Sequence, residues 1–284
     1  MRKLKKLFVS FLAMLMLFTC TLGITGCGED IKKLEIQFEV YNYSAGTMET
    51  HTLEVDLYRH LAEQTVDAIT NYVNEGYYDN NVVYVMSTFS TQIMFGEIVA
   101  NGNDIEQNAI KPQIPGEFKH GGTVGSNLKN VKGSIGLWRT WYSFDENAYK
   151  SANATDTGRA TCYIPTQSIA DYNDYFCVFA KFDLEKETNK NAIDALTNAF
   201  SKEENYESYV IFYTGEYDEN KPDQNFGLEF NIMLQDDYWE VEQTLDVFET
   251  DTEQEHFVHY NPTTIRIPVV NGEFGATIVS AKIV

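Results

Sequence analysis

Two short segments near the start of the chain, each alternating apolar and polar residues, limit the fold most strongly. They are Leu34–Tyr41 (LEIQFEVY) and Thr52–Tyr58 (TLEVDLY). Alternation sends successive side chains to opposite faces, which is typical of strands with one buried face. The residues between them are turn formers such as Asn, Ser and Gly. We therefore predict a β-hairpin at this point of the chain.

An amphipathic helix is predicted directly after this hairpin. In Ala62–Glu75 the apolar residues recur at helical spacing, and Gly76 provides a stop signal. A second amphipathic helix is predicted over Asn191–Phe200, and two closing strands over Thr263–Val270 and Ala276–Val284. The pattern therefore indicates a mainly β fold with two helices.

Two further segments carry recognisable motifs. Gly76–Gln92 reads GYYDNNVVYVMSTFSTQ, and Gly133–Phe182 contains GSIGLWRT, ATCYIPT and DYFCVFAKF. Together they resemble the cyclophilin family, whose bacterial members carry G-x-Y-D-G-x-x-F-H-R, F-M-x-Q-G-G-D, G-x-x-S-M-A-R, S-Q-F-F-I and V-F-G-K-V in that order. The corresponding segments of this chain occur in the same order and with nearly the same spacing. The resemblance implies a closed β-barrel and peptidyl-prolyl cis–trans isomerase activity.

The chain departs from this family before its closing strands. Residues 201–260 are too many for the usual return to the final strand, and they include two apparent strands, Tyr209–Tyr213 and Gly227–Leu234. We expect one cyclophilin-like domain over residues 34–284, with 201–260 as an inserted elaboration on the flank of the barrel.

The resemblance also assigns site residues. Phe89 falls on the pocket phenylalanine and Gln92 on the glutamine that positions the substrate backbone. Tyr163 falls on the aromatic residue of the pocket floor, and Arg139 on the residue that closes the M-A-R motif at the pocket rim. Phe89 and Gln92 are thus the expected catalytic pair.

The departures from the motifs are equally specific. Trp138 replaces an alanine and Phe176 replaces a pocket histidine, so both are expected to contact substrate. The catalytic arginine of the family falls on Val85, or on Met86 if the alignment shifts by one residue. Neither side chain donates a hydrogen bond. We expect Val85 to be the equivalent position.

The missing arginine matters because of the chemistry. A prolyl peptide bond rotates slowly, since amide resonance imposes a barrier of roughly 20 kcal/mol. In the family, an arginine donates toward the prolyl nitrogen as the amide twists, which is electrostatic preorganisation without metal or cofactor. Impaired activity is therefore expected here. The alternative is a non-catalytic proline-peptide-binding chaperone or scaffold module.

The aromatic residues assigned to the pocket have two interpretations. Phe89, Trp138, Tyr163 and Phe176 either fill the former pocket as core or line a concave aromatic site for proline-containing polypeptide. Gln92 favours the second interpretation, because burying a glutamine without partners is costly.

The N-terminus predicts export. A basic start, MRKLKK, precedes an apolar run, Leu7–Phe18, that is short for a membrane span and typical of a secretory signal. Ile24-Thr25-Gly26-Cys27 resembles the lipobox of bacterial lipoproteins. We therefore expect a lipoprotein signal peptide over residues 1–26, lipidation at Cys27, and a short linker over 27–33. The predicted location is extracytoplasmic, anchored to the bacterial cell membrane.

The charge excludes some partners. Residues 1–26 contain four basic residues and no acidic one, so the remainder has 17 basic against 42 acidic residues, a net charge of −25. Nucleic-acid binding requires a basic surface and is not expected. This negative net charge also disfavours adsorption to an anionic membrane. The lipid at Cys27 is therefore the predicted anchor.

Cysteine and histidine add little chemistry. Cys162 and Cys177 are expected to remain free thiols, although a disulfide between neighbouring strands is an alternative. His256 and His259 lie in an acidic segment and have metal-ligand spacing, but isolated surface histidines are the simpler interpretation. We predict no metal and no cofactor.

Overall fold

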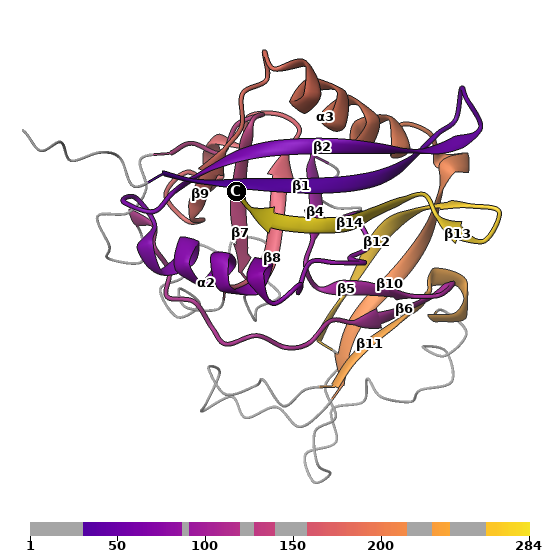
Figure 1. Cartoon of the computed structure of the whole chain (residues 1–284). Helices are drawn as coiled ribbons and strands as arrows, with labels where there is room; N and C mark the ends of the chain where they lie inside the picture. The colour runs from indigo at the N-terminus through magenta and orange to yellow at the C-terminus, as the bar shows by residue number, and fades with distance from the viewer. Residues whose placement is uncertain (1–30, 87–90, 120–127, 140–157, 215–228, 239–259) are drawn as a thin grey trace, which may run out of the picture.

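The structure is a computed structural model that describes residues 31–86, 91–119, 128–139, 158–214, 229–238 and 260–284 (Figure 1). Within these ranges it is mainly β with two principal helices, as predicted. The helices are α2 (Glu63–Asn74) and α3 (Glu187–Ala199). The strands are β1 (Ile31–Asn42), β2 (Thr47–Tyr58), β3 (Tyr84–Met86), β4 (Gln92–Phe95), β5 (Ile98–Asn101), β6 (Asp104–Gln107), β7 (Ser134–Arg139), β8 (Gly158–Pro165), β9 (Val178–Lys181), β10 (Tyr206–Thr214), β11 (Glu229–Leu234), β12 (Tyr260–Val270), β13 (Glu273–Phe274) and β14 (Ala276–Ile283).

The predicted hairpin is confirmed, and its alternation explains its place. β1 and β2 pair in continuous antiparallel register from Ile31 opposite Tyr58 to Asn42 opposite Thr47. In β1 every second residue from Leu34 to Val40 is buried, so one face of the hairpin enters the core. The predicted helices and closing strands are present too, at α2, α3, β12 and β14.

The main sheet follows the order β11-β10-β12-β3-β4-β8-β7-β9-β2-β1-β14, with antiparallel pairing. At one end of this sheet, β14 forms hydrogen bonds with the residues that directly precede β3. The Asn80 N–H donates to the Ile278 carbonyl at 2.8 Å, and the Val83 N–H donates to the Ala276 carbonyl at 3.1 Å. These hydrogen bonds join the two ends of the path from β3 to β14, so its strands surround an enclosed core.

That core is covered by a helix at each side. Apolar residues of α2, including Val66 and Ile69, belong to one continuous buried cluster with Ile193 and Leu196 of α3 and the inward side chains of the strands. Figure 1 shows α2 and α3 on opposite sides of the strands. Burial of one stripe of each helix explains why their apolar residues recur at helical spacing.

The segment predicted as an insertion extends the sheet beyond the barrel. β10 pairs with both β11 and β12, and β12 pairs with β3 through Ile265 opposite Met86. The two apparent strands of the sequence are thus β10 and β11. Residues 215–228 and 239–259 of this region, with His256 and His259, lie outside the described residues.

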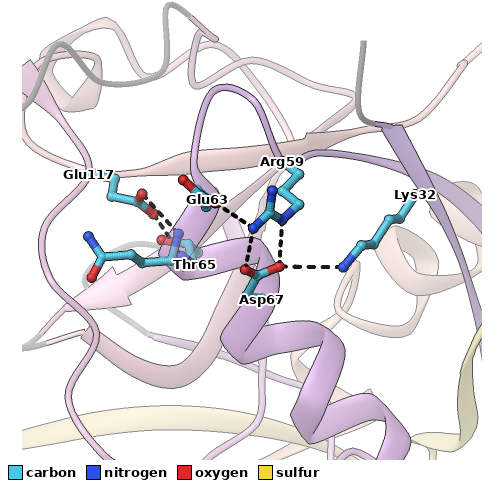
Figure 2. A network of polar contacts seen from close by, with 7 residues as sticks. Lys32, Arg59, Glu63, Thr65, Asp67 and Glu117 are labelled. Atoms are coloured by element: carbon cyan, nitrogen blue, oxygen red, sulfur yellow. Dashed lines mark hydrogen bonds and ion pairs between the residues drawn. The ribbon is translucent and has the colours of Figure 1, made fainter. Parts of the chain in front are cut away.

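The first turn of α2 is capped by a distant segment. Ala62, at the N-cap position, has no side chain that accepts a hydrogen bond. Instead the Glu117 carboxylate accepts from the N–H groups of Gln64 at 3.0 Å and Thr65 at 2.7 Å (Figure 2). This contact fastens the loop after β6 to the helix.

An ion-pair network lies beside this cap. The Arg59 guanidinium donates to both carboxylate oxygens of Asp67, each at 2.8 Å, and also contacts Glu63 (Figure 2). Lys32 reaches Asp67 at 3.4 Å. The arginine hydrogen bonds hold the pKa of Asp67 below its usual value. The network connects β1, the end of β2 and α2.

Candidate functional site

Side chains of β3 and β4 alternate between the inside and the outside of the barrel. Val85 and Ile93 face each other across the two strands and belong to the interior cluster. Tyr84 and Met94 also face each other, and they belong to a second buried cluster on the other side of the strands. We call this second side the outer face.

Four aromatic side chains form the centre of the outer face. Phe176 stacks between two of them, with ring centroids 4.2 Å from Tyr172 and 5.4 Å from Trp138. Tyr163 lies edge-on to Trp138 at 6.0 Å and to Phe176 at 5.9 Å. Three of these rings are buried, and Trp138 is the one that remains partly exposed. Trp138 is therefore the ring that a ligand would meet first.

Tyr163 is fixed in this cluster by two residues that sequence reasoning missed. Its hydroxyl donates to Oδ1 of Asn130, and burial raises its pKa well above the usual value. Its ring lies directly over Gly136, where an added Cβ would approach the ring to 2.3 Å. Only glycine fits beneath this tyrosine. Gly136 lies within the GSIGLWRT motif, but the resemblance assigned no role to it or to Asn130, because the contact between Gly136 and Tyr163 depends on the pairing of β7 with β8.

Gln92 extends the outer face beyond the aromatic rings. By alternation along β4 it shares the face of Met94, and the strand register places it beside Met86 of β3. Gln92 is 1% exposed, and its Oε1 has no hydrogen-bond partner among the described residues. A buried acceptor without a partner is costly. The amide is therefore a buried polar group with an unused acceptor on an otherwise apolar face.

Arg139 does not lie at the rim where the resemblance placed it. It is 2% exposed, and its Nε donates to the carbonyl of Tyr175 at 2.7 Å. The guanidinium lies 5.0 Å from the ring of Phe118 and 5.1 Å from that of Phe176. In this position Arg139 supports the aromatic cluster from behind, because cations are attracted to the faces of aromatic rings.

The structure distinguishes the two positions onto which the resemblance places the missing arginine. Val85, which we expected to be that position, is 3% exposed and points into the barrel core. Met86 is partly exposed, packs against the outer cluster and neighbours Gln92. An arginine that served the outer face would stand at Met86. The short spacing to Phe89 was the sequence signal for this one-residue shift.

The remaining predicted site residues lie outside the described part of the chain. Phe89 falls in residues 87–90, and Cys27 falls in residues 1–30. Among the predicted residues that are described, Gln92, Trp138, Tyr163 and Phe176 share the outer face.

Other chemistry finds little support in the described ranges. No group of three His, Cys, Asp or Glu residues suited to a metal ion occurs there. Cys162 and Cys177 are buried free thiols, and burial raises the pKa of each to about 12. No helix within those ranges is long and apolar enough to cross a membrane.

No family model and no curated relative matches the chain. Among solved structures, a cyclophilin-type peptidyl-prolyl cis–trans isomerase of Cryptosporidium parvum is similar at 14% identity, over 61% of this chain and 88% of that one, with a TM-score of 0.39. A structure of that isomerase in the presence of the dipeptide Ala-Pro is similar at 15% identity, over 59% and 88%, with a TM-score of 0.34. The described part of this chain is itself mainly β with two principal helices.

Proposed function

We propose that this chain is a cyclophilin-type foldase that binds proline-containing segments of exported polypeptides on its outer face and isomerises them slowly. The observation that carries the proposal is the buried Gln92 amide, whose Oε1 has no partner among the described residues. It stands on the same face as the aromatic cluster. An apolar surface with one available polar group is typical of sites that orient a small ligand.

The residues of the outer face suit a prolyl segment. A proline ring is apolar and preset near the φ of extended peptides, so it packs on an aromatic face at little entropic cost. The partly exposed Trp138, stacked on Phe176, supplies such a face. Gln92 would hydrogen-bond the peptide backbone beside it, because a peptide N–H is the donor its Oε1 lacks.

Slow turnover follows from the side chains at the arginine position. Val85 points inward, and Met86 has no hydrogen to donate to a prolyl nitrogen that becomes pyramidal. Donors aimed at developing charge contribute roughly 2.7–4 kcal/mol in preorganised sites. Without such a donor, the site would accelerate isomerisation only through apolar binding of the peptide and any distortion that binding imposes on it.

The proposed location is the outer surface of the bacterial cell membrane. The lipobox-like Ile24-Thr25-Gly26-Cys27 supports lipidation at Cys27 after removal of residues 1–26. An N-terminal cysteine with more than one acyl chain anchors stably. Residues 27–33 would then hold the domain over 34–284 close to the membrane, where newly exported chains emerge.

Two measurements test the proposal together. The first is a protease-coupled assay on an Ala-Pro-Phe peptide, and the second is binding of the same peptide by calorimetry. We expect saturable binding and a rate above buffer that is far below that of a cyclophilin with the arginine. Absence of binding would refute the proposed site.

A binding-only module is the second candidate. It is favoured by the deep burial of Tyr163 and Phe176, which leaves less room for a proline ring than an open pocket. It is selected if the peptide binds while the isomerisation rate equals that of buffer.

A further inference from the structure

A large polar cleft lies between the β1–β2 hairpin and α3, built from residues other than those of the outer face. Its volume is about 620 Å³, within the range of small-molecule sites. Asn189 holds its two walls together, since its side chain accepts from the Glu54 N–H at 2.8 Å and donates to the Glu54 carbonyl at 3.1 Å. In Figure 1, α3 runs alongside β2, with the hairpin tip near its C-terminal end.

The helix wall of the cleft presents three short polar side chains. Asn191, Asp194 and Asn198 are spaced three and four residues apart, so they lie on one face of α3. All three are exposed, so their side chains are accessible to a ligand. Asn and Asp are poor helix formers, and a face that only met solvent would be more stable with Glu or Lys.

The hairpin wall presents a fixed aromatic ring and a fixed carboxylate. Tyr43 is 37% exposed; its hydroxyl donates to the Asn205 carbonyl at 3.0 Å, and its ring lies edge-on to Tyr41 at 5.1 Å. The Glu49 carboxylate accepts from Nδ2 of Asn42 at 2.9 Å. Each group is thus oriented by a hydrogen bond within the protein, and such preorganisation lowers the entropic cost of binding a ligand.

The charges of the cleft disfavour an anionic ligand. Glu49 and Asp194 are acidic. The basic groups that line the cleft already face carboxylates, since Lys202 contacts Glu204 at 3.4 Å and His51 lies 3.7 Å from Glu49. Amides both donate and accept, and carboxylates accept, so this set matches groups that both donate and accept. Sugar hydroxyls have that property, and the apolar face of a sugar ring packs on an aromatic side chain.

We propose that this cleft binds a neutral oligosaccharide, with one sugar ring over Tyr43 and hydroxyls hydrogen-bonded by Asn191, Asp194 and Asn198. From Asn191 to Asn198 the helix rises by roughly 10 Å, which suits a ligand of two sugar rings. This site does not depend on the proposed prolyl-peptide function. It would give the domain a contact with glycans in addition to polypeptide.

Calorimetric titration of the protein with cellobiose, maltose and N,N′-diacetylchitobiose tests the proposal. We expect at least one of them to bind with a Kd of about 1 mM or tighter. The double variant Asn191→Ala/Asn198→Ala should weaken that binding at least tenfold. Its Tm should not fall, because alanine is the better helix former. Lys190→Ala, on the same helix outside the cleft, should leave binding unchanged.

Three outcomes would overturn this inference. The first is that none of the three disaccharides binds at concentrations well above about 1 mM. The second is that binding persists unchanged in the double variant, since the sugar would then lie elsewhere. The third is that the cleft binds Ca²⁺ instead, with affinity lost in Asp194→Asn and no response to sugar.

Discussion

The Glu117 carboxylate accepts a hydrogen bond from the backbone N–H of Thr65 at 2.7 Å, across 52 residues of sequence. It thereby supplies the helix cap that Ala62 cannot provide. Carboxylates at helix N-termini also interact favourably with the helix dipole. One side chain thus connects the loop after β6 to the helix that covers the barrel.

Removing this carboxylate should destabilise the protein. Glu117→Ala leaves two N–H groups of the first turn without their acceptor, and we expect the free energy of unfolding to fall by about 1.5–3 kcal/mol. Urea denaturation of wild type and variant measures the difference. Glu63→Ala, which removes an exposed contact with Arg59, is the control and should cost less than about 1 kcal/mol. Equal losses in both would contradict the capping role.

Adding a donor at Met86 should raise the proposed isomerase activity. Met86→Arg places a guanidinium on the outer face beside Gln92, and we expect at least a tenfold gain in kcat/KM in the protease-coupled assay, since such donors are worth roughly 2.7–4 kcal/mol. Val85→Arg is the matched comparison. It would bury a charge in the barrel core and should lower the free energy of unfolding by more than about 3 kcal/mol, with no gain in activity. A gain in activity with Val85→Arg and none with Met86→Arg would support Val85 as the arginine position, as expected from the sequence.

Trp138 should report peptide binding directly. In a Trp141→Phe/Trp239→Phe background it is the single tryptophan, since the chain has three. Because Trp138 is partly exposed on the outer face, a proline-rich peptide should shift its emission, and Trp138→Ala should weaken peptide binding. Saturable binding that appears only in the alanine variant would mean that the indole blocks the site.

The buried thiols should make stability fall at alkaline pH. Burial raises the pKa of Cys162 and Cys177 to about 12, from a usual value near 9. Above pH 9 the unfolded state loses these protons while the folded state keeps them, so the free energy of unfolding decreases as pH rises toward 12. Each thiol contributes a slope of about 1.4 kcal/mol per pH unit.

Comparison with Cys162→Ala/Cys177→Ala isolates this effect from the tyrosines that titrate in the same range. Urea denaturation of a soluble form beginning at Gly28, between pH 8 and 10.5, should show a steeper decline for wild type than for the double variant. Parallel declines would mean that the thiols titrate normally in the folded protein.

The proposed anchor depends on one residue outside the described structure. Cys27→Ser should block lipidation, and the protein should move from the detergent phase to the aqueous phase in a Triton X-114 partition of cells. A variant at Cys162 that partitions like wild type is the control. If Cys27→Ser still enters the detergent phase completely, the lipoprotein assignment is wrong.

Local patterns in the sequence are sufficient to predict most elements and much of their order. Alternation in Leu34–Tyr41 and Thr52–Tyr58, and helical spacing in Ala62–Glu75, predicted the hairpin and α2, because each pattern reflects burial of one face of a single element. The motifs around Gln92 and Tyr163 predicted that both belong to one site, and both lie on the outer face. Such properties belong to single strands or helices, so they are visible in the order of residues along the chain.

Strand register and contacts between distant segments are seen only once the elements are packed together. A shift of one residue in β3 exchanges Val85 and Met86 between core and outer face, and no pattern in Val82–Met86 distinguishes them, since all are apolar. The buried position of Arg139, the glycine beneath Tyr163 and the cap from Glu117 to Thr65 each join segments far apart in sequence. Such contacts arise from packing of whole elements, so the sequence contains no local sign of them.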